Sequence, residues 1–121
     1  MPVTEVVFFA ERAGTVPVLD WLDGLPLKAR DKCFVRIERL AALGHEMRRP
    51  EADYLRDGIY ELRIRMGRVN YRILYFFHRR RVVVLAHGLT KEEEVPERDI
   101  EVAIRRGREF TANPGPHTHR Q

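Results

Sequence analysis

The chain of 121 residues is 44% hydrophobic and 33% charged, contains one cysteine and has a formal net charge of +4. These values describe one soluble globular domain with a modest core. They exclude an intrachain disulfide, and no apolar run is long enough to span a membrane. Arginine supplies most of the positive charge, and its planar guanidinium favours phosphate, so we expect a polyanionic partner.

The first predicted element is a strand from Val3 to Phe9, where β-branched and aromatic residues predominate. The N-terminus has no basic stretch and carries Glu5 within its apolar run, so the sequence does not predict a signal peptide. The single cysteine fits a reducing compartment, and together these features indicate a cytoplasmic protein.

Two helices follow the first strand. Thr15 is expected to cap the first helix, Pro17 suits its first turn, and Gly24 ends it. The second helix begins after Pro26 and ends at Gly44, a residue that favours the backbone conformation of a helix C-terminus.

The second helix has an apolar side and a basic side. Cys33 lies on the apolar side, so we interpret it as a packing residue and not as a catalytic thiol. The basic side carries three candidate RNA contacts, Lys28, Lys32 and Arg36. An ordinary solvated helix face is the alternative explanation for this side.

Residues Glu46 to Asp57 are charged and lack periodicity, so they are predicted to form a loop. The next stretch, Ile59 to His87, predicts a three-stranded antiparallel meander, because its first strand alternates apolar and charged residues. Gly67-Arg68 suits a two-residue type II′ turn. This turn sets Arg63 opposite Arg72, on the face that points away from the core.

A second hairpin is predicted to turn at residues 78–81 and to pair Phe77 with Val82. This register brings His87 opposite Arg72. The meander therefore predicts a row of Arg63, Arg72 and His87 across three strands.

Two guanidinium groups about 5–6 Å apart repel by about 3 kcal/mol at an effective dielectric constant near 20. A phosphate bound between Arg63 and Arg72 would convert this repulsion into attraction. Alternatively, the arginines spread into water or pair with acids such as Glu61.

The C-terminal third begins with three consecutive acids, Glu92 to Glu94. Pro96 is expected to open a last helix, with acids in its first turn that match the helix dipole. Gly107 is expected to end this helix. We therefore predict one domain at residues 1–107 and a flexible tail at residues 108–121.

Several short motifs occur together in one order along the chain. They are Tyr60-Glu61-Leu62-Arg63, Tyr71-Arg72-Ile73-Leu74-Tyr75-Phe76-Phe77, Leu85-Ala86-His87-Gly88-Leu89, Lys91 and the helix led by Pro96. From Val3 to Arg106 the chain resembles the phage-derived HigB/RelE-like toxins. The resemblance implies an α+β, RelE-like fold, in which an N-terminal helical hairpin and a C-terminal helix pack on a twisted antiparallel sheet.

The resemblance also implies a function, that of the toxin in a type II toxin–antitoxin system. Most such toxins are endoribonucleases (mRNA interferases) that cut mRNA inside the ribosome, inhibit translation and arrest growth. They need no metal or cofactor, because the 2′-hydroxyl of the substrate attacks the adjacent phosphate. The implied partners are a helix-turn-helix (HigA-like) antitoxin, mRNA and the ribosome, and no membrane is implied.

The family's site residues carry over onto four positions of this chain. Arg72 matches the phosphate-binding arginine of the family, and Arg63 matches the arginine of its Glu-Leu-Arg motif. His87 and Lys91 match its His-Gly-Phe…Lys-Lys region. His87 is the one histidine inside the predicted row, so it is the candidate acid or base. Five further basic residues are assigned to RNA binding: Arg65, Arg68, Lys28, Lys32 and Arg36.

One segment departs from the family pattern. Relatives carry paired lysines and a threonine where this chain has Lys91 followed by Glu92 to Glu94. This difference removes a cation from the expected site and adds carboxylates beside it. A weakened or differently specific nuclease, or a degenerate member that only binds its partner, is therefore an alternative. A non-enzymatic gyrase inhibitor of the ParE type on the same scaffold is a further alternative.

Overall fold

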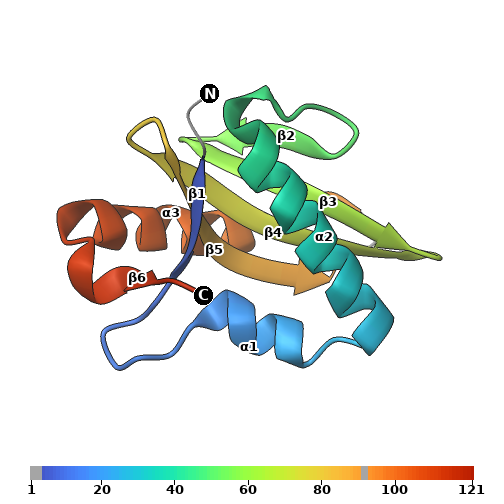
Figure 1. The fold of residues 1–121 in the computed structure, drawn as a ribbon, viewed down its shortest axis with the longest axis horizontal. Coiled ribbons are helices and arrows are strands. Elements are labelled where there is room, and N and C mark those ends of the chain that lie inside the picture. The colour runs from blue at the N-terminus through green and yellow to red at the C-terminus, as the bar shows by residue number, and fades with distance from the viewer. Residues whose placement is uncertain (1–3, 91–92) are drawn as a thin grey trace.

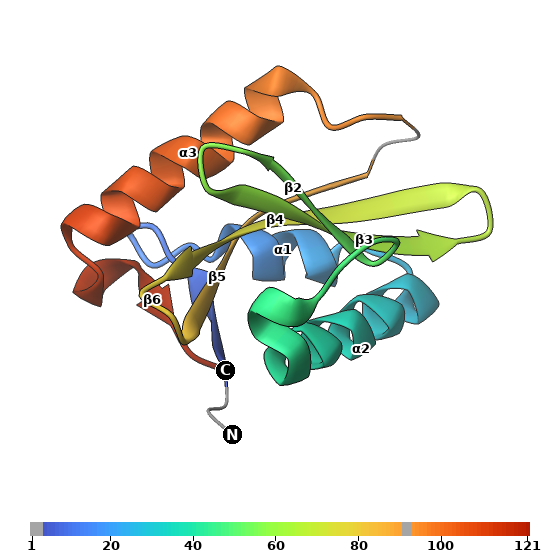
Figure 2. The same ribbon diagram turned by 90° about the horizontal axis from the view of Figure 1, so that it is seen from above.

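The computed structural model describes residues 4–90 and 93–121 as an α+β structure in three layers. A six-stranded mixed sheet has the strand order β2-β3-β4-β5-β1-β6. Helices α1 and α2 cover one face and α3 covers the other (Figures 1 and 2). The elements are β1 (Glu5–Phe9), α1 (Pro17–Asp23), α2 (Leu27–Leu43), β2 (Ala52–Arg56), β3 (Ile59–Met66), β4 (Val69–His78), β5 (Val82–Thr90), α3 (Glu97–Ala112) and β6 (Thr118–His119), with short 3-10 turns η1 (Gly44–Glu46) and η2 (Gly115–His117).

The β3–β4 hairpin has the predicted register. Met66 pairs with Val69 and Arg63 pairs with Arg72. Gly67 has φ 62°, as the first central residue of a type II′ turn requires. The prediction is confirmed. It could be made from the sequence because it depends only on the two-residue period of the strands and on one turn.

The predicted register of the β4–β5 hairpin is wrong. His78 pairs with Val82, so the turn comprises residues 79–81, and Arg79 enters the left-handed region at φ 57°. The register shifts again where Tyr75 pairs with Leu85 but Leu74 pairs with His87. A bulge of this kind places one extra residue on one strand, and no alternation pattern specifies it.

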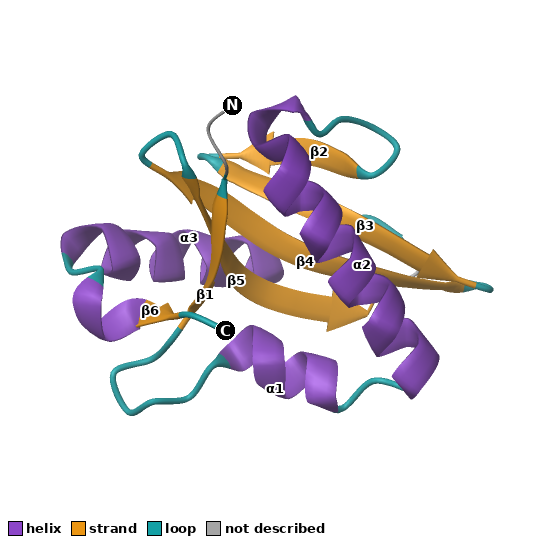
Figure 3. Ribbon diagram, in the orientation of Figure 1, coloured by secondary structure: helices purple, strands orange, loops and turns teal. Residues whose placement is uncertain are grey.

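The prediction of an entirely antiparallel sheet is also wrong, because β1 pairs with β5 in parallel. The buried side chains of β1 reach both faces: Val7 and Phe9 pack under α3, whereas Phe8 packs under α1 and α2. Strands that are buried on both faces suit the interior of a sheet. The helical hairpin of α1 and α2 carries the chain from β1 across one face to the far edge, at β2 (Figure 3).

The predicted loop at Glu46 to Asp57 contains an edge strand, β2, which pairs with β3. Asp57 and Gly58 connect the two strands with φ values of 50° and 81°. Two consecutive positive φ values are typical of a type I′ hairpin, for which Asp-Gly is a favoured sequence. The turn signal was therefore present in the sequence.

The predicted end of the last helix and the predicted flexible tail are wrong. α3 continues through Gly107 to Ala112. A methyl group at Gly107 would lie 3.6 Å from the Phe76 ring, so this glycine lies directly over the sheet. Beyond α3, β6 pairs with β1, and His117 is buried with its ring stacked on Phe9 at 5.1 Å.

The two faces of the sheet carry separate apolar cores. The core under α1 and α2 includes Val18, Leu22, Cys33 and Leu40, and it is closed at β5 by Gly88, whose Cα faces the Trp21 ring. The core under α3 includes Ile59, Leu74, Phe76 and Phe110. None of the described helices is both long enough and apolar enough to cross a bilayer.

Candidate functional site

Arg63 and Arg72 face each other across β3 and β4, and Glu61 joins them. The Glu61 carboxylate is buried and accepts hydrogen bonds on Oε1 from Arg63 Nε at 3.1 Å and from Arg72 Nε at 3.0 Å. The Arg63 guanidinium also lies 3.5 Å from Asp53. The alternative in which the arginines pair with Glu61 is therefore what the structure shows, and both side chains are held in fixed positions.

Two grooves of contrasting charge meet at this arginine pair. One, of about 380 Å³, is acidic at the N-terminal end of α3, where Glu93, Glu94 and Glu97 line it together with Arg63 and Arg72. The other, of about 400 Å³, is basic; besides Arg63 and Arg72 its lining residues include Arg36, Arg65, Asn70 and Glu51. An anion that approaches the pair from the second groove meets more cations than carboxylates.

His87 lies on the same sheet face but does not lie opposite Arg72, because the β5 bulge places Leu89 there. His87 is held instead by α3: its Nε2 lies 2.7 Å from Asp99 Oδ1, and Arg106 Nη1 lies 3.2 Å from its Nδ1. Because Arg106 can only donate, Nδ1 accepts and Nε2 carries the proton. His87 lines neither groove beside the arginine pair.

The pKa of His87 is lowered from its ordinary value of 6.5. Burial is the main cause, the hydrogen bond to Asp99 acts in the opposite direction, and the positive charge of Arg106 lowers the pKa further. The resting imidazole is therefore neutral near pH 7.

The predicted RNA-binding residues separate into two groups. Lys32 and Arg36 extend from α2 to the β3 edge, where they donate to the carbonyl oxygens of Arg65 at 3.1 Å and Arg63 at 2.8 Å. Arg65, Arg68 and Lys28 have exposed side chains. The predicted catalytic Lys91 lies outside the described residues, as does Glu92.

Asp99 and Arg106, the partners of His87, are not among the predicted site residues. Their spacing of seven residues is two helical turns, so both project from the same side of α3. Arg106 also donates to the Ala86 carbonyl at 2.8 Å and lies 3.8 Å from Glu11. The side of a helix is predictable from spacing, whereas the strand residue that it meets depends on how the helix packs.

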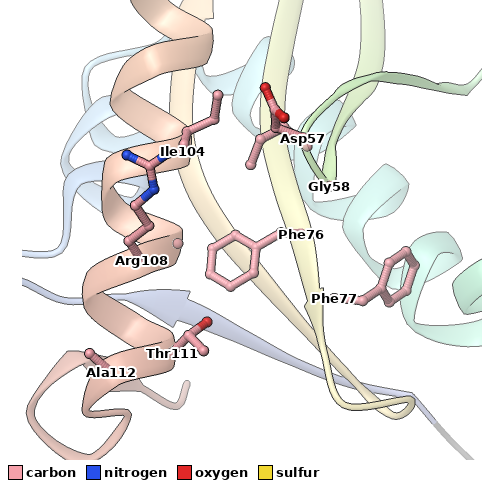
Figure 4. A pocket seen from close by; sticks show the side chains of 10 residues that line it. Asp57, Gly58, Phe76, Phe77, Ile104, Arg108, Thr111 and Ala112 are labelled. Carbon is pink, nitrogen blue, oxygen red and sulfur yellow. The ribbon is translucent and has the colours of Figure 1, made fainter.

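A separate groove of about 620 Å³ lies between α3 and the β2–β3 turn. Figure 4 shows the Phe76 ring inside it, with Ile104 and Arg108 on α3 and Asp57 at the turn on its rim. The Phe77 ring points to the other side of β4. Of the predicted catalytic and RNA-binding residues that the structure describes, none lines this groove.

Two observations concern other kinds of site. Burial raises the pKa of the Cys33 thiol to about 11, which suits a packing residue and not a nucleophile. Among residues 4–90 and 93–121, no group of three His, Cys, Asp or Glu side chains is arranged to hold a metal ion.

Residues 20–108 match a family model described as phage-derived protein Gp49-like (DUF891). The chain belongs to this family. The Gp49-like family is related to the RelE toxins of toxin–antitoxin systems. No curated protein matches the chain significantly.

The Gp49-like match runs from within α1 into α3, so it includes both arginines, Glu61 and the His87–Asp99–Arg106 cluster. It leaves β1 and β6 outside. The coarse prediction of a phage-derived, toxin-like protein is thus confirmed, whereas the narrower HigB assignment stays a prediction.

Proposed function

We propose that this Gp49-like chain is the toxin of a type II toxin–antitoxin system and cleaves mRNA on the ribosome. The observation that carries the proposal is the Arg63–Arg72 pair, which is fixed by Glu61 and opens onto the basic groove. Fixed cations at one point of a sheet suit a reaction in which negative charge develops on a phosphate.

The proposed reaction uses the RNA itself as the nucleophile. The 2′-hydroxyl oxygen forms a bond to the adjacent phosphorus, and the bond from phosphorus to the 5′-oxygen breaks, which leaves a 2′,3′-cyclic phosphate and a 5′-hydroxyl. Arg63 and Arg72 would bind the non-bridging oxygens. Because only 13% of the Arg72 side chain is exposed and Glu61 anchors it, little reorganisation is needed when the charge develops.

Proton transfer in this reaction is assigned to His87 and Lys91. In the resting arrangement Nδ1 of His87 accepts from Arg106 and Nε2 donates to Asp99, so one of these contacts must give way before His87 can act on a substrate. We propose that Arg106 releases Nδ1 when RNA binds. Lys91 would neutralise the backbone or protonate the leaving oxygen.

The proposed partners are a HigA-like helix-turn-helix antitoxin, mRNA and the ribosome, in the cytoplasm. Lys28, Lys32, Arg36, Arg65 and Arg68 are the proposed RNA contacts. Lys32 and Arg36 already bind β3 carbonyl oxygens, so their contribution would come from charge more than from new hydrogen bonds.

One observation favours a second candidate, a non-enzymatic inhibitor on the same scaffold. Glu61 already neutralises part of the charge of both arginines, and both nitrogens of His87 have partners. A gyrase inhibitor of the ParE type, or a member that only binds its antitoxin, needs neither a free cation pair nor a free imidazole.

Induction of the chain in a bacterial host, with growth followed and transcript 5′ ends mapped, tests the proposal. The variants are Arg72→Gln and Arg63→Gln, and the matched control is Arg98→Gln, whose side chain is 85% exposed on α3. Arrest with new cleavages inside translated frames is expected for the parent chain and the control. Both effects should fall at least about tenfold in Arg72→Gln if the side chain stabilises the transition state.

Two results would overturn the nuclease proposal. Arrest with intact transcripts and trapped DNA would identify a gyrase inhibitor, and the absence of arrest would identify a member that only binds its partner. Thermal unfolding of the purified variants separates loss of function from loss of fold.

A further inference from the structure

The turn between β4 and β5 consists of three consecutive arginines, Arg79, Arg80 and Arg81, and all three are exposed. Within residues 4–90 and 93–121, none of the three has a carboxylate within 4.0 Å. Most arginines in the rest of the described chain do have such a partner, including Arg63 and Arg72 of the candidate site. Net positive charge is therefore concentrated at this turn.

The arginine turn (residues 79–81) is anchored at both ends by its neighbours. His78 and Val82 pair directly before and after it, and the Arg81 carbonyl accepts a hydrogen bond from the Glu5 amide at 2.7 Å. The His78 ring packs edge-on against Phe110 of α3 at 5.0 Å. The three guanidinium groups therefore project from a backbone that β1, α3 and the hairpin fix together.

The surroundings of the turn favour a nucleic acid over a protein as its ligand. The exposed large hydrophobic side chains among the described residues are Leu27 and Val35 on α2, Tyr54 on β2, and Val69 at the end of β4 farthest from this turn. The buried core of a protein interface is more apolar than the rest of the protein surface. Phosphate backbones are bound by charge alone, without such a core.

The distance between the turn and the candidate site can be spanned by one nucleic-acid strand. From Arg72 to Arg79 the chain advances seven residues along β4, or about 23 Å at roughly 3.3 Å per residue. The exposed Arg68 lies beyond the other end of this strand, directly before Val69. A polymer with regularly spaced negative charges can contact the arginine turn and the candidate site at once.

We propose that the arginine turn is a second phosphate-binding site, which holds the RNA backbone at a distance from the point of cleavage. The identity of the polyanion as RNA rests on the proposed function. The turn would add affinity and orientation, and it would take no part in the chemistry at Arg63 and Arg72.

The test compares two triple variants that remove the same charge. Arg79→Asn, Arg80→Gln and Arg81→Gln neutralise the turn, with asparagine at residue 79 because it tolerates a positive φ. The matched control is Arg12→Gln, Arg98→Gln and Arg108→Gln, which neutralises exposed arginines elsewhere. Binding of polyuridylate and of purified bacterial ribosomes is measured over a range of salt concentrations.

For polyuridylate, the slope of log affinity against log salt should fall by about 2 in the turn variant, since each phosphate contact on a single strand contributes about 0.7. The ribosome complex should also weaken about tenfold or more, and the control should change much less in both assays. Equal changes in the two variants would mean that net charge alone acts, and would overturn the proposal. So would undetectable binding by the parent chain, or a turn variant that keeps its RNA affinity but loses a protein partner.

The outcome is distinguishable from that of the cleavage experiment. If the chain does not cut RNA but the salt slope of its RNA affinity falls only in the turn variant, the second binding site is supported and the nuclease proposal is rejected. Cleavage by a chain whose turn and control variants bind alike supports the nuclease and rejects the binding site.

Discussion

His87 of β5 and Asp99 of α3 are joined by a hydrogen bond of 2.7 Å from Nε2 to Oδ1. Arg106, two helical turns after Asp99, donates to the other ring nitrogen. The bulged end of β5 is thus attached to α3 through a neutral imidazole that uses both nitrogens. Helix α3 contributes Glu97 and Ile100 to the acidic groove beside the arginine pair, so this attachment also positions one wall of that groove.

The first prediction concerns the pH dependence of stability. Because the pKa of His87 is lower in the folded state than its ordinary 6.5, the unfolded chain binds more protons in the window between the two values. The contribution of His87 to the free energy of unfolding should be complete above about pH 6.5 and should decrease as the pH falls through this window. Urea unfolding at pH 7.5 and 5.5 measures this decrease in the free energy of unfolding.

The controls for this prediction are His87→Gln and His119→Gln. Near pH 7, His87→Gln should lower the free energy of unfolding by about 1–3 kcal/mol, since Asp99 and Arg106 lose a buried partner. It should also flatten the pH dependence more than His119→Gln does, because the latter leaves the contacts of His87 with Asp99 and Arg106 in place. An unchanged slope in His87→Gln would contradict the assignment.

The second prediction concerns the carboxylate between the arginines. Glu61→Gln should lower the free energy of unfolding by about 2–4 kcal/mol, because it removes the buried carboxylate that the two opposed guanidinium groups share. Added phosphate should raise the melting temperature of this variant more than that of the parent chain, since an anion can replace the carboxylate.

Differential scanning fluorimetry with phosphate and with chloride at equal ionic strength separates binding from screening. The double variant Glu61→Gln with Arg72→Gln serves as the control, because it removes one cation of the pair. Equal stabilisation of all three proteins by phosphate would argue against an anion site between Arg63 and Arg72.

The third prediction concerns Gly88. A methyl group at this position would overlap the Trp21 ring, so Gly88→Ala should lower the free energy of unfolding by about 1–3 kcal/mol. Gly107→Ala is the matched control; its methyl group would make an ordinary contact with Phe76 at 3.6 Å, and this variant should be more stable by about 0.5–1 kcal/mol.

Thermal unfolding of Gly88→Ala and Gly107→Ala measures these two changes in stability. The smaller side chain of Trp21→Leu should partly relieve the cost of Gly88→Ala. If the changes in the free energy of unfolding of Gly88→Ala and Trp21→Leu simply add in the double variant, the overlap is not the cause of the destabilisation.

The fourth prediction concerns the C-terminal segment. The His117 ring stacks on Phe9 with an angle of 7° between the rings, and its Nδ1 donates to the Ala10 carbonyl at 2.7 Å. His117→Ala should lower the free energy of unfolding by about 2–4 kcal/mol through the loss of a buried ring and a hydrogen bond. Gln121→Ala, at the exposed end of the chain, is the control. A wild-type-like midpoint in His117→Ala would support a loosely held tail.

The sequence by itself determined the part of the site that depends on local geometry. The two-residue period of β3 and β4, together with the Gly67-Arg68 turn, sets Arg63 opposite Arg72, and the structure has this pairing. The helical hairpin followed from glycine and proline at the helix ends in the same way. Each of these features is specified by residues that are close in sequence.

Only the tertiary structure decided where His87 and the C-terminal segment lie. A turn of three residues and a bulge shift β5 by two positions relative to the predicted register, and α3 then supplies Asp99 and Arg106 to the histidine. His117 is buried because Phe9, more than a hundred residues earlier, offers a ring for it to stack on. Such contacts depend on how finished elements pack against one another, and no period or turn within the sequence encodes that packing.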